Sequence, residues 1–104
     1  MNALKIYGEG DNSVTDRMWY ELALQICNGL QGLKTDQDKV TIIAVCIGAS
    51  TVSPTGTVTN EHVIPFVEPS RKILDRLNSL GTSYISRISV EYVRQQLEII
   101  LKSS

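Results

Sequence analysis

Three stretches of the chain repeat apolar residues at steps of three and four, the spacing of an amphipathic helix. The first follows Ser13 and Thr15, either of which can act as a helix N-cap. The second opens at Glu68-Pro69-Ser70 and ends at Gly81, a residue suited to a C-cap. The third starts at Ser89 as its cap and has Val90, Val93, Leu97, Ile100 and Leu101 on its inner side. We therefore expect three helices.

Four other segments have the composition of β-strands. Lys39–Ile47 is the clearest, because its centre is almost continuously apolar and rich in β-branched residues, as in a strand buried on both faces. Leu4–Tyr7 alternates and is followed by turn formers. Thr57–Ile64 alternates only at its start and ends before Pro65, and Ser83–Ile88 is short. We expect a strand in each.

The resulting order is β-α-β-β-α-β followed by one more helix. This order is typical of a ferredoxin-like α+β sandwich, in which helices cover one face of an antiparallel sheet. A small three-layer α/β fold with parallel neighbouring strands is the alternative. The 104 residues are enough for one hydrophobic core, so we expect a single domain over residues 1–104.

The amino-acid composition limits the kinds of partner that we expect for this protein. Hydrophobic residues make up 42% and charged residues 20% of the chain, which is ordinary for a folded globular domain. Ten basic and eleven acidic side chains leave a net charge of -1, so the broad basic surface of a nucleic-acid-binding protein is not expected. No apolar run approaches the ~20 residues of a membrane span, and the first residues lack the pattern of a signal peptide. We expect a cytoplasmic protein without a nucleic-acid or membrane partner.

The two cysteines also favour a cytoplasmic protein. Cys27 and Cys46 stand among apolar neighbours, without a CxxC spacing, and the chain has one histidine. A structural zinc site uses about four nitrogen or sulfur ligands, so we expect no metal and no cofactor. Reduced, buried and inert thiols are the expectation, although a Cys27–Cys46 disulfide stays open on sequence alone.

The segment from residue 50 to residue 60 is the first candidate binding site. Six of its eleven residues carry hydroxyl groups, including Ser50, Thr51, Ser53, Thr55 and Thr57. Hydroxyls and free backbone groups in a loop at a strand end can bind a polar small molecule. An ordinary solvated turn is the alternative interpretation.

Three further candidates carry ionisable groups. His62 is the one imidazole of the chain and could serve as a general acid or base near neutral pH. Glu9 and Asp11, in the glycine-rich segment before the first predicted helix, could hold a divalent cation. Arg87 could contact an anion, and so could Arg71. A plain surface role is the alternative for each.

The last predicted helix has more apolar positions than one core contact needs, because Tyr92 and Ile99 lie outside its inner stripe. Surplus apolar surface is typical of a contact between protein chains. We therefore expect a homodimer or a larger closed oligomer. The function this favours is a small oligomeric binding or regulatory module for a polar small molecule or a protein. A small enzyme with an inter-subunit acid/base site around His62, and a protein–protein adaptor or assembly component, are the alternatives.

Overall fold

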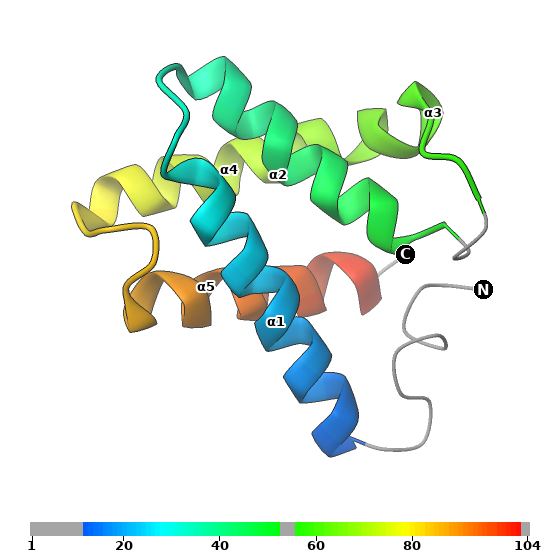
Figure 1. The fold of residues 1–104 in the computed structure, drawn as a ribbon, viewed down its shortest axis with the longest axis horizontal. Coiled ribbons are helices and arrows are strands. Elements are labelled where there is room, and N and C mark those ends of the chain that lie inside the picture. The colour runs from blue at the N-terminus through cyan, green and yellow to red at the C-terminus, as the bar shows by residue number, and fades with distance from the viewer. Residues whose placement is uncertain (1–11, 53–55, 103–104) are drawn as a thin grey trace.

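All regular structure in the described part of the chain is helical. The computed structural model describes residues 12–52 and 56–102, with side chains from residue 17 onward. Its elements are α1 (Asn12–Leu30), α2 (Asp36–Ser50), α3 (Asn60–Val63), the 3₁₀ helix η2 (Ile64–Phe66), α4 (Val67–Leu80) and α5 (Arg87–Lys102) (Figure 1). No strand occurs in these two ranges. The predicted ferredoxin-like α+β sandwich is therefore wrong, and so is the three-layer α/β alternative.

The largest error concerns residues 39–47, which were expected to form a central strand and lie within α2. The chain enters α2 through Thr35, whose side-chain oxygen accepts a hydrogen bond from the Asp38 amide at 3.1 Å. Asp36 and Asp38 occupy the first turn, where the positive end of the helix dipole favours carboxylates. The cap and the buried stripe at Val40, Ile43, Ala44 and Ile47 together outweigh the β-branched composition.

The two other predicted strands in the described ranges are also absent. Residues 57–59 carry no regular structure, and the segment after them forms α3 and η2. Pro65 is tolerated there because it lies at the start of η2, where a backbone amide needs no helical partner. The last expected strand, 83–88, is a turn over residues 83–86 followed by the first two residues of α5. The first expected strand, Leu4–Tyr7, lies outside the described residues.

The three predicted helices are confirmed with small shifts at their ends. α1 begins at Asn12, just before the predicted cap residues, and ends at Leu30. α4 ends at Leu80, and its C-cap is Gly81, whose φ of 63° is the left-handed conformation that glycine adopts without strain. α5 begins at Arg87, so Ser89 lies inside the helix and is not its cap.

The helices pack as two contacting pairs. α1 packs on α5, α2 packs on α4, and α1 also contacts α2. Figure 1 shows α1 crossing the middle of the molecule in front of α5, with α2 and α4 above. The shared core is drawn from all four long helices, and its largest fully buried side chains include Trp19, Ile26, Leu30, Ile43, Ile47, Ile73, Leu74, Leu77, Leu97 and Leu101.

Candidate functional site: the α4–α5 groove and the outer face of α5

A network of hydroxyl groups holds the turn between α4 and α5. The Ser89 side chain is fully buried, and its hydroxyl donates to the Ser83 carbonyl at 3.0 Å. The same oxygen lies 3.0 Å from the Thr82 hydroxyl and accepts from the Ser86 hydroxyl at 3.1 Å. Ser86 also accepts from the Ser89 amide at 3.3 Å, which caps the first turn of α5. These bonds fix where α5 starts relative to the end of α4.

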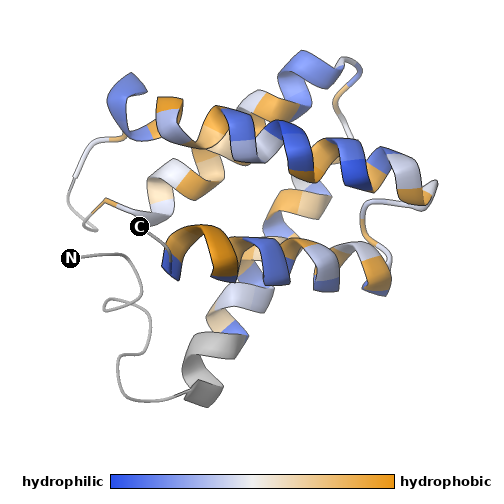
Figure 2. Ribbon diagram, turned by 180° about the vertical axis from the view of Figure 1, so that it is seen from behind, coloured by the Kyte–Doolittle hydropathy of each residue, from blue (hydrophilic) through white to orange (hydrophobic). Residues whose placement is uncertain are grey.

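Beside this turn the two helices form a groove of about 430 Å³. α4 contributes Arg76 and Leu80, one turn apart. α5 contributes the remaining lining residues, which are Arg87, Ile88, Glu91, Tyr92 and Gln95. Figure 2 shows α4 and α5 lying one above the other on this side of the molecule. The volume is within the range of small-molecule sites.

Tyr92 is half-buried in the groove and electrostatically coupled to Arg76. Desolvation raises the pKa of the Tyr92 phenol, and the positive charge of Arg76 acts in the opposite direction. Because desolvation is the larger effect, the phenol is protonated at neutral pH and can donate a hydrogen bond. The groove therefore contains two guanidinium groups and one phenolic donor.

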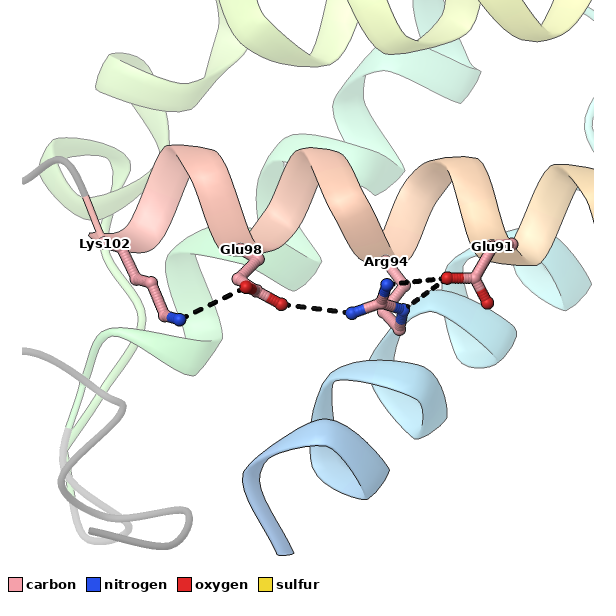
Figure 3. Close-up of polar contacts among 4 residues, drawn as sticks. All are labelled: Glu91, Arg94, Glu98 and Lys102. Carbon is pink, nitrogen blue, oxygen red and sulfur yellow. Dashed lines mark hydrogen bonds and ion pairs between the residues drawn. The ribbon is translucent and has the colours of Figure 1, made fainter. Parts of the chain in front are cut away.

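One flank of α5 carries a row of alternating charges (Figure 3). Arg94 contacts Glu91 at 2.6 Å and Glu98 at 3.0 Å, and Lys102 contacts Glu98 at 3.2 Å. These pairs are three or four residues apart on one helix, where each contributes a few tenths of a kcal/mol. Glu91, which lines the groove, is therefore paired with a cation on its own helix.

The outer face of α5, which we define by Ile88, Gln95 and Ile99, lies opposite the core, and Tyr92 at its edge is half-buried and packs against the core. Ile88 and Leu97 are nine residues apart, which at about 100° per residue places them on opposite sides of the helix. Leu97 is fully buried, while Ile88 is 63% and Ile99 is 61% exposed. Ile85, just before the helix, is 50% exposed. α5 is therefore apolar on two opposite sides.

The hydroxyl-rich segment is divided between a helix end and a loop. The Ser50 hydroxyl is buried and donates to the Ile47 carbonyl at 2.6 Å, and the Thr51 hydroxyl donates to the Gly48 carbonyl at 2.7 Å. Thr57 is exposed, and Ser53 and Thr55 lie outside the described residues. The hydroxyls of Ser50, the last residue of α2, and of Thr51, its C-cap, thus satisfy carbonyl groups of the last turn.

His62 lies in α3 and takes part in a local cap. Its Nδ1 accepts a hydrogen bond from the Thr59 amide at 3.1 Å and lies 2.9 Å from the Thr59 hydroxyl. α3 and the start of α5 lie at opposite ends of the molecule, so His62 and Arg87 do not share a site (Figure 1). Within the described ranges no ion pair joins His62 to a carboxylate. The enzyme hypothesis around His62 stays a prediction without a described partner group.

The remaining candidates from the sequence are the acidic pair before α1 and the two cysteines. Glu9 and Asp11 lie outside the described residues, and among the described side chains no three potential metal ligands gather. Cys27 and Cys46 are both free thiols; Cys27 is fully buried and Cys46 is half-buried. Burial raises the pKa of both, to about 11 for Cys27, so both stay protonated at neutral pH. In the described ranges no helix is both long and apolar enough to cross a bilayer.

Of the predicted site residues, Arg87 alone lines the groove. Arg71, the other proposed anion contact, is exposed on α4 and is not among its lining residues. Sequence reasoning missed Arg76, Leu80 and Ile88. The four-residue spacing of Arg76 and Leu80 indicates that they lie on one side of a helix. Ile88 was missed because residues 83–88 were assigned to a strand and not to the helix that follows.

Comparisons of the chain with protein-family models, curated proteins and solved structures found no match. The function is therefore argued from the geometry of the groove and the outer face of α5.

Proposed function

We propose that this protein is a small helical interaction module that self-associates through the outer face of α5. The observation that carries the proposal is the second apolar side of α5, opposite the side that packs in the core. A homodimer would remove the isoleucine side chains of this face from water, and each buried CH₂ contributes about 0.8 kcal/mol. The role is one of binding and assembly.

The distribution of exposed apolar residues supports this surface over others. Four isoleucines are at least half exposed among the described residues: Ile64, Ile85, Ile88 and Ile99. Three of these belong to the segment 85–99, whereas Ile64 is isolated on η2. Ile88 and Ile99 lie on one side of α5, about three helical turns apart, and apolar residues gathered on one side of a helix favour a contact. A two-fold contact would use the same patch on both copies.

An adaptor that binds a different protein through the same face is the second candidate. The hollow beside Ile99 favours it, because Arg94, Gln95, Glu98 and Ile99 line a depression of about 270 Å³ that a foreign side chain could enter. Both candidates are compatible with a cytoplasmic location, which we propose because both cysteines are free thiols.

Light scattering after size exclusion tests the proposal. At about 10–100 µM we expect a mass of at least twice the 11.5 kDa of the chain for the wild type, with dissociation on dilution. Ile99→Glu places a charge on the contact face and should give a monomer. Ile64→Glu is the matched control, because Ile64 is equally exposed, at 65%, and lies on η2.

A wild type that stays at the mass of one chain over this range overturns self-association and leaves the adaptor as the candidate. Equal effects of Ile99→Glu and Ile64→Glu would move the contact away from α5. Circular dichroism of both variants shows whether the helices are intact.

A further inference from the structure

We propose that the α4–α5 groove binds a small apolar monocarboxylate. The carboxylate would lie between Arg76 and Arg87, and its hydrocarbon part would lie on Leu80, Ile88 and the ring of Tyr92. This inference goes beyond self-association, and the groove is formed within one chain. Ile88 and Gln95 line the groove and also belong to the outer face of α5, so self-association and ligand binding would compete for them.

The charge of the ligand follows from the pairing of the lining residues. Neither Arg76 nor Arg87 forms an ion pair with an acidic side chain in the described part of the chain. Glu91 lines the same groove, but its carboxylate is engaged by Arg94 at 2.6 Å. Two guanidinium groups without a carboxylate partner therefore face a groove whose one acid is already paired. The groove has complementary charge for an anion.

Two features favour a carboxylate over a phosphate. The planar guanidinium matches a carboxylate in a bidentate arrangement, and the protonated Tyr92 phenol can supply one more donor. A phosphate dianion would bring a second negative charge close to Glu91, and it offers no apolar part. A monoanion is repelled less by the same neighbour.

The remaining lining residues of the groove indicate that the ligand has a hydrocarbon part. Leu80, Ile88 and the Tyr92 ring give the groove mainly apolar walls. Ile88 is exposed, so a hydrocarbon chain laid on it would be removed from water together with the isoleucine. Apolar walls with a few polar groups that fix one end are the usual design of a small-ligand site.

The test is a titration of ¹⁵N-labelled full-length protein with octanoate, octan-1-ol and inorganic phosphate, followed by nuclear magnetic resonance. Octanoate should shift the side-chain signals of Arg76 and Arg87 and the amides around Ile88. Octan-1-ol has the same chain without the charge, and it should bind at least about tenfold more weakly, as expected when charge-assisted hydrogen bonds are lost. Phosphate should not saturate over the same range.

Variants assign the effect to the two arginines. Arg76→Gln and Arg87→Gln should each weaken octanoate binding by about tenfold. Arg71→Gln, on the exposed surface of the same helix, should leave it unchanged. Repeating the titration in Ile99→Glu keeps the result independent of self-association, because that variant is designed to be monomeric and Ile99 does not line the groove.

Equal binding of octanoate and octan-1-ol would overturn the role of the arginines, and saturable phosphate binding would replace the monocarboxylate with a general anion. Shifts confined to other helices, or an equal loss in Arg71→Gln, would overturn the site itself. Binding by Ile99→Glu at the named residues supports the site even if the wild type never forms a dimer.

Discussion

Two buried serines show how much a single hydroxyl depends on its partners. Ser70 on α4 and Ser89 on α5 are both fully buried. The Ser89 hydroxyl is bonded to the Ser83 carbonyl and to two other hydroxyls, whereas the Ser70 hydroxyl has no hydrogen-bond partner. A buried hydroxyl costs free energy when it is unpaired and contributes when it is paired.

Alanine substitution should therefore have opposite effects at these two positions. Ser70→Ala removes an unpaired group and adds the best helix former, so we expect a gain of about 1 kcal/mol in the free energy of unfolding. Ser89→Ala leaves the Ser83 carbonyl without its donor and should cost about 1–2 kcal/mol. Urea denaturation measures both. A loss in Ser70→Ala as large as that in Ser89→Ala would contradict this assignment of partners.

The thiol of Cys27 gives the protein a pH dependence at the alkaline end. Burial raises its pKa from 9.0 to about 11 in the folded state. The stabilisation that follows is complete below about pH 9 and is lost as the pH rises towards 11, because the unfolded chain releases the proton first. Between about pH 8.5 and about pH 10.5 this group alone should lower the free energy of unfolding by about 2 kcal/mol.

The measurement is urea unfolding of the wild type and of Cys27→Ala at those two pH values in the presence of a reductant. The wild type should lose more stability than Cys27→Ala over the interval, and the difference reports the thiol. Identical losses would mean that the thiol is not desolvated in the folded state.

At the scale of elements, the prediction from sequence and the structure differ most at α2. Its residues Thr41, Ile42, Ile43 and Val45 are β-branched, so composition indicated a strand. The N-terminal end of the segment decides in favour of a helix. Thr35 caps it, and the Lys39 amide already donates to the Thr35 carbonyl at 3.1 Å. A threonine followed by acidic residues, as in residues 35–38, is a signal for a helix start.

A substitution at Thr41 distinguishes a helix from a strand in this segment. Thr41 is exposed, and its hydroxyl bonds back to the Gln37 carbonyl at 2.9 Å, one turn earlier. Thr41→Ala should raise the free energy of unfolding by about 0.5 kcal/mol, because alanine is the better helix former at a surface position. In a strand the same change would be destabilising. Thr35→Ala should cost about 1 kcal/mol through loss of the cap, and urea denaturation compares the two.

The helices that were predicted correctly share one property. In α4 and α5 polar residues separate the buried positions along the chain, so the spacing of three and four stays visible, and a cap residue marks one end of each: Gly81 at the end of α4 and Ser86 before α5. In α2 the apolar residues continue around the helix: Val45 is partly exposed and Cys46 is half-buried. Periodicity is informative where a helix has a polar face, and it is ambiguous where a helix is apolar on most sides.

At the scale of the whole molecule, the error in α2 carried through to the architecture. Residues 39–47 and three shorter segments with strand-like composition together predict a sheet, and none of them forms a strand in the described ranges. The packing of α1 on α5 and of α2 on α4 depends on contacts far apart in sequence. Local patterns do not specify such pairings, so neither the groove nor its arginine from α4 could be read from the chain.

The apolar surplus of the last helix did not depend on the fold class. The sequence places Tyr92 and Ile99 beyond one core stripe. In the structure Tyr92 is half-buried against the core, whereas Ile99 is exposed on the side of α5 away from Leu97. Hydrophobic spacing alone shows that a helix has two apolar sides. Which side faces the core, and that Ile88 belongs to the outer one, required the structure.

The central claim is that the outer face of α5 meets the same face of a second copy. The most direct measurement is an isotope-filtered nuclear Overhauser experiment on a mixture of labelled and unlabelled chains, which detects contacts between copies only. We expect cross-peaks from the methyl groups of Ile88 and Ile99 in one copy to protons of α5 in the other. If cross-peaks between copies are absent at concentrations where the mass is that of a dimer, or if they arise from another helix, the claim is wrong.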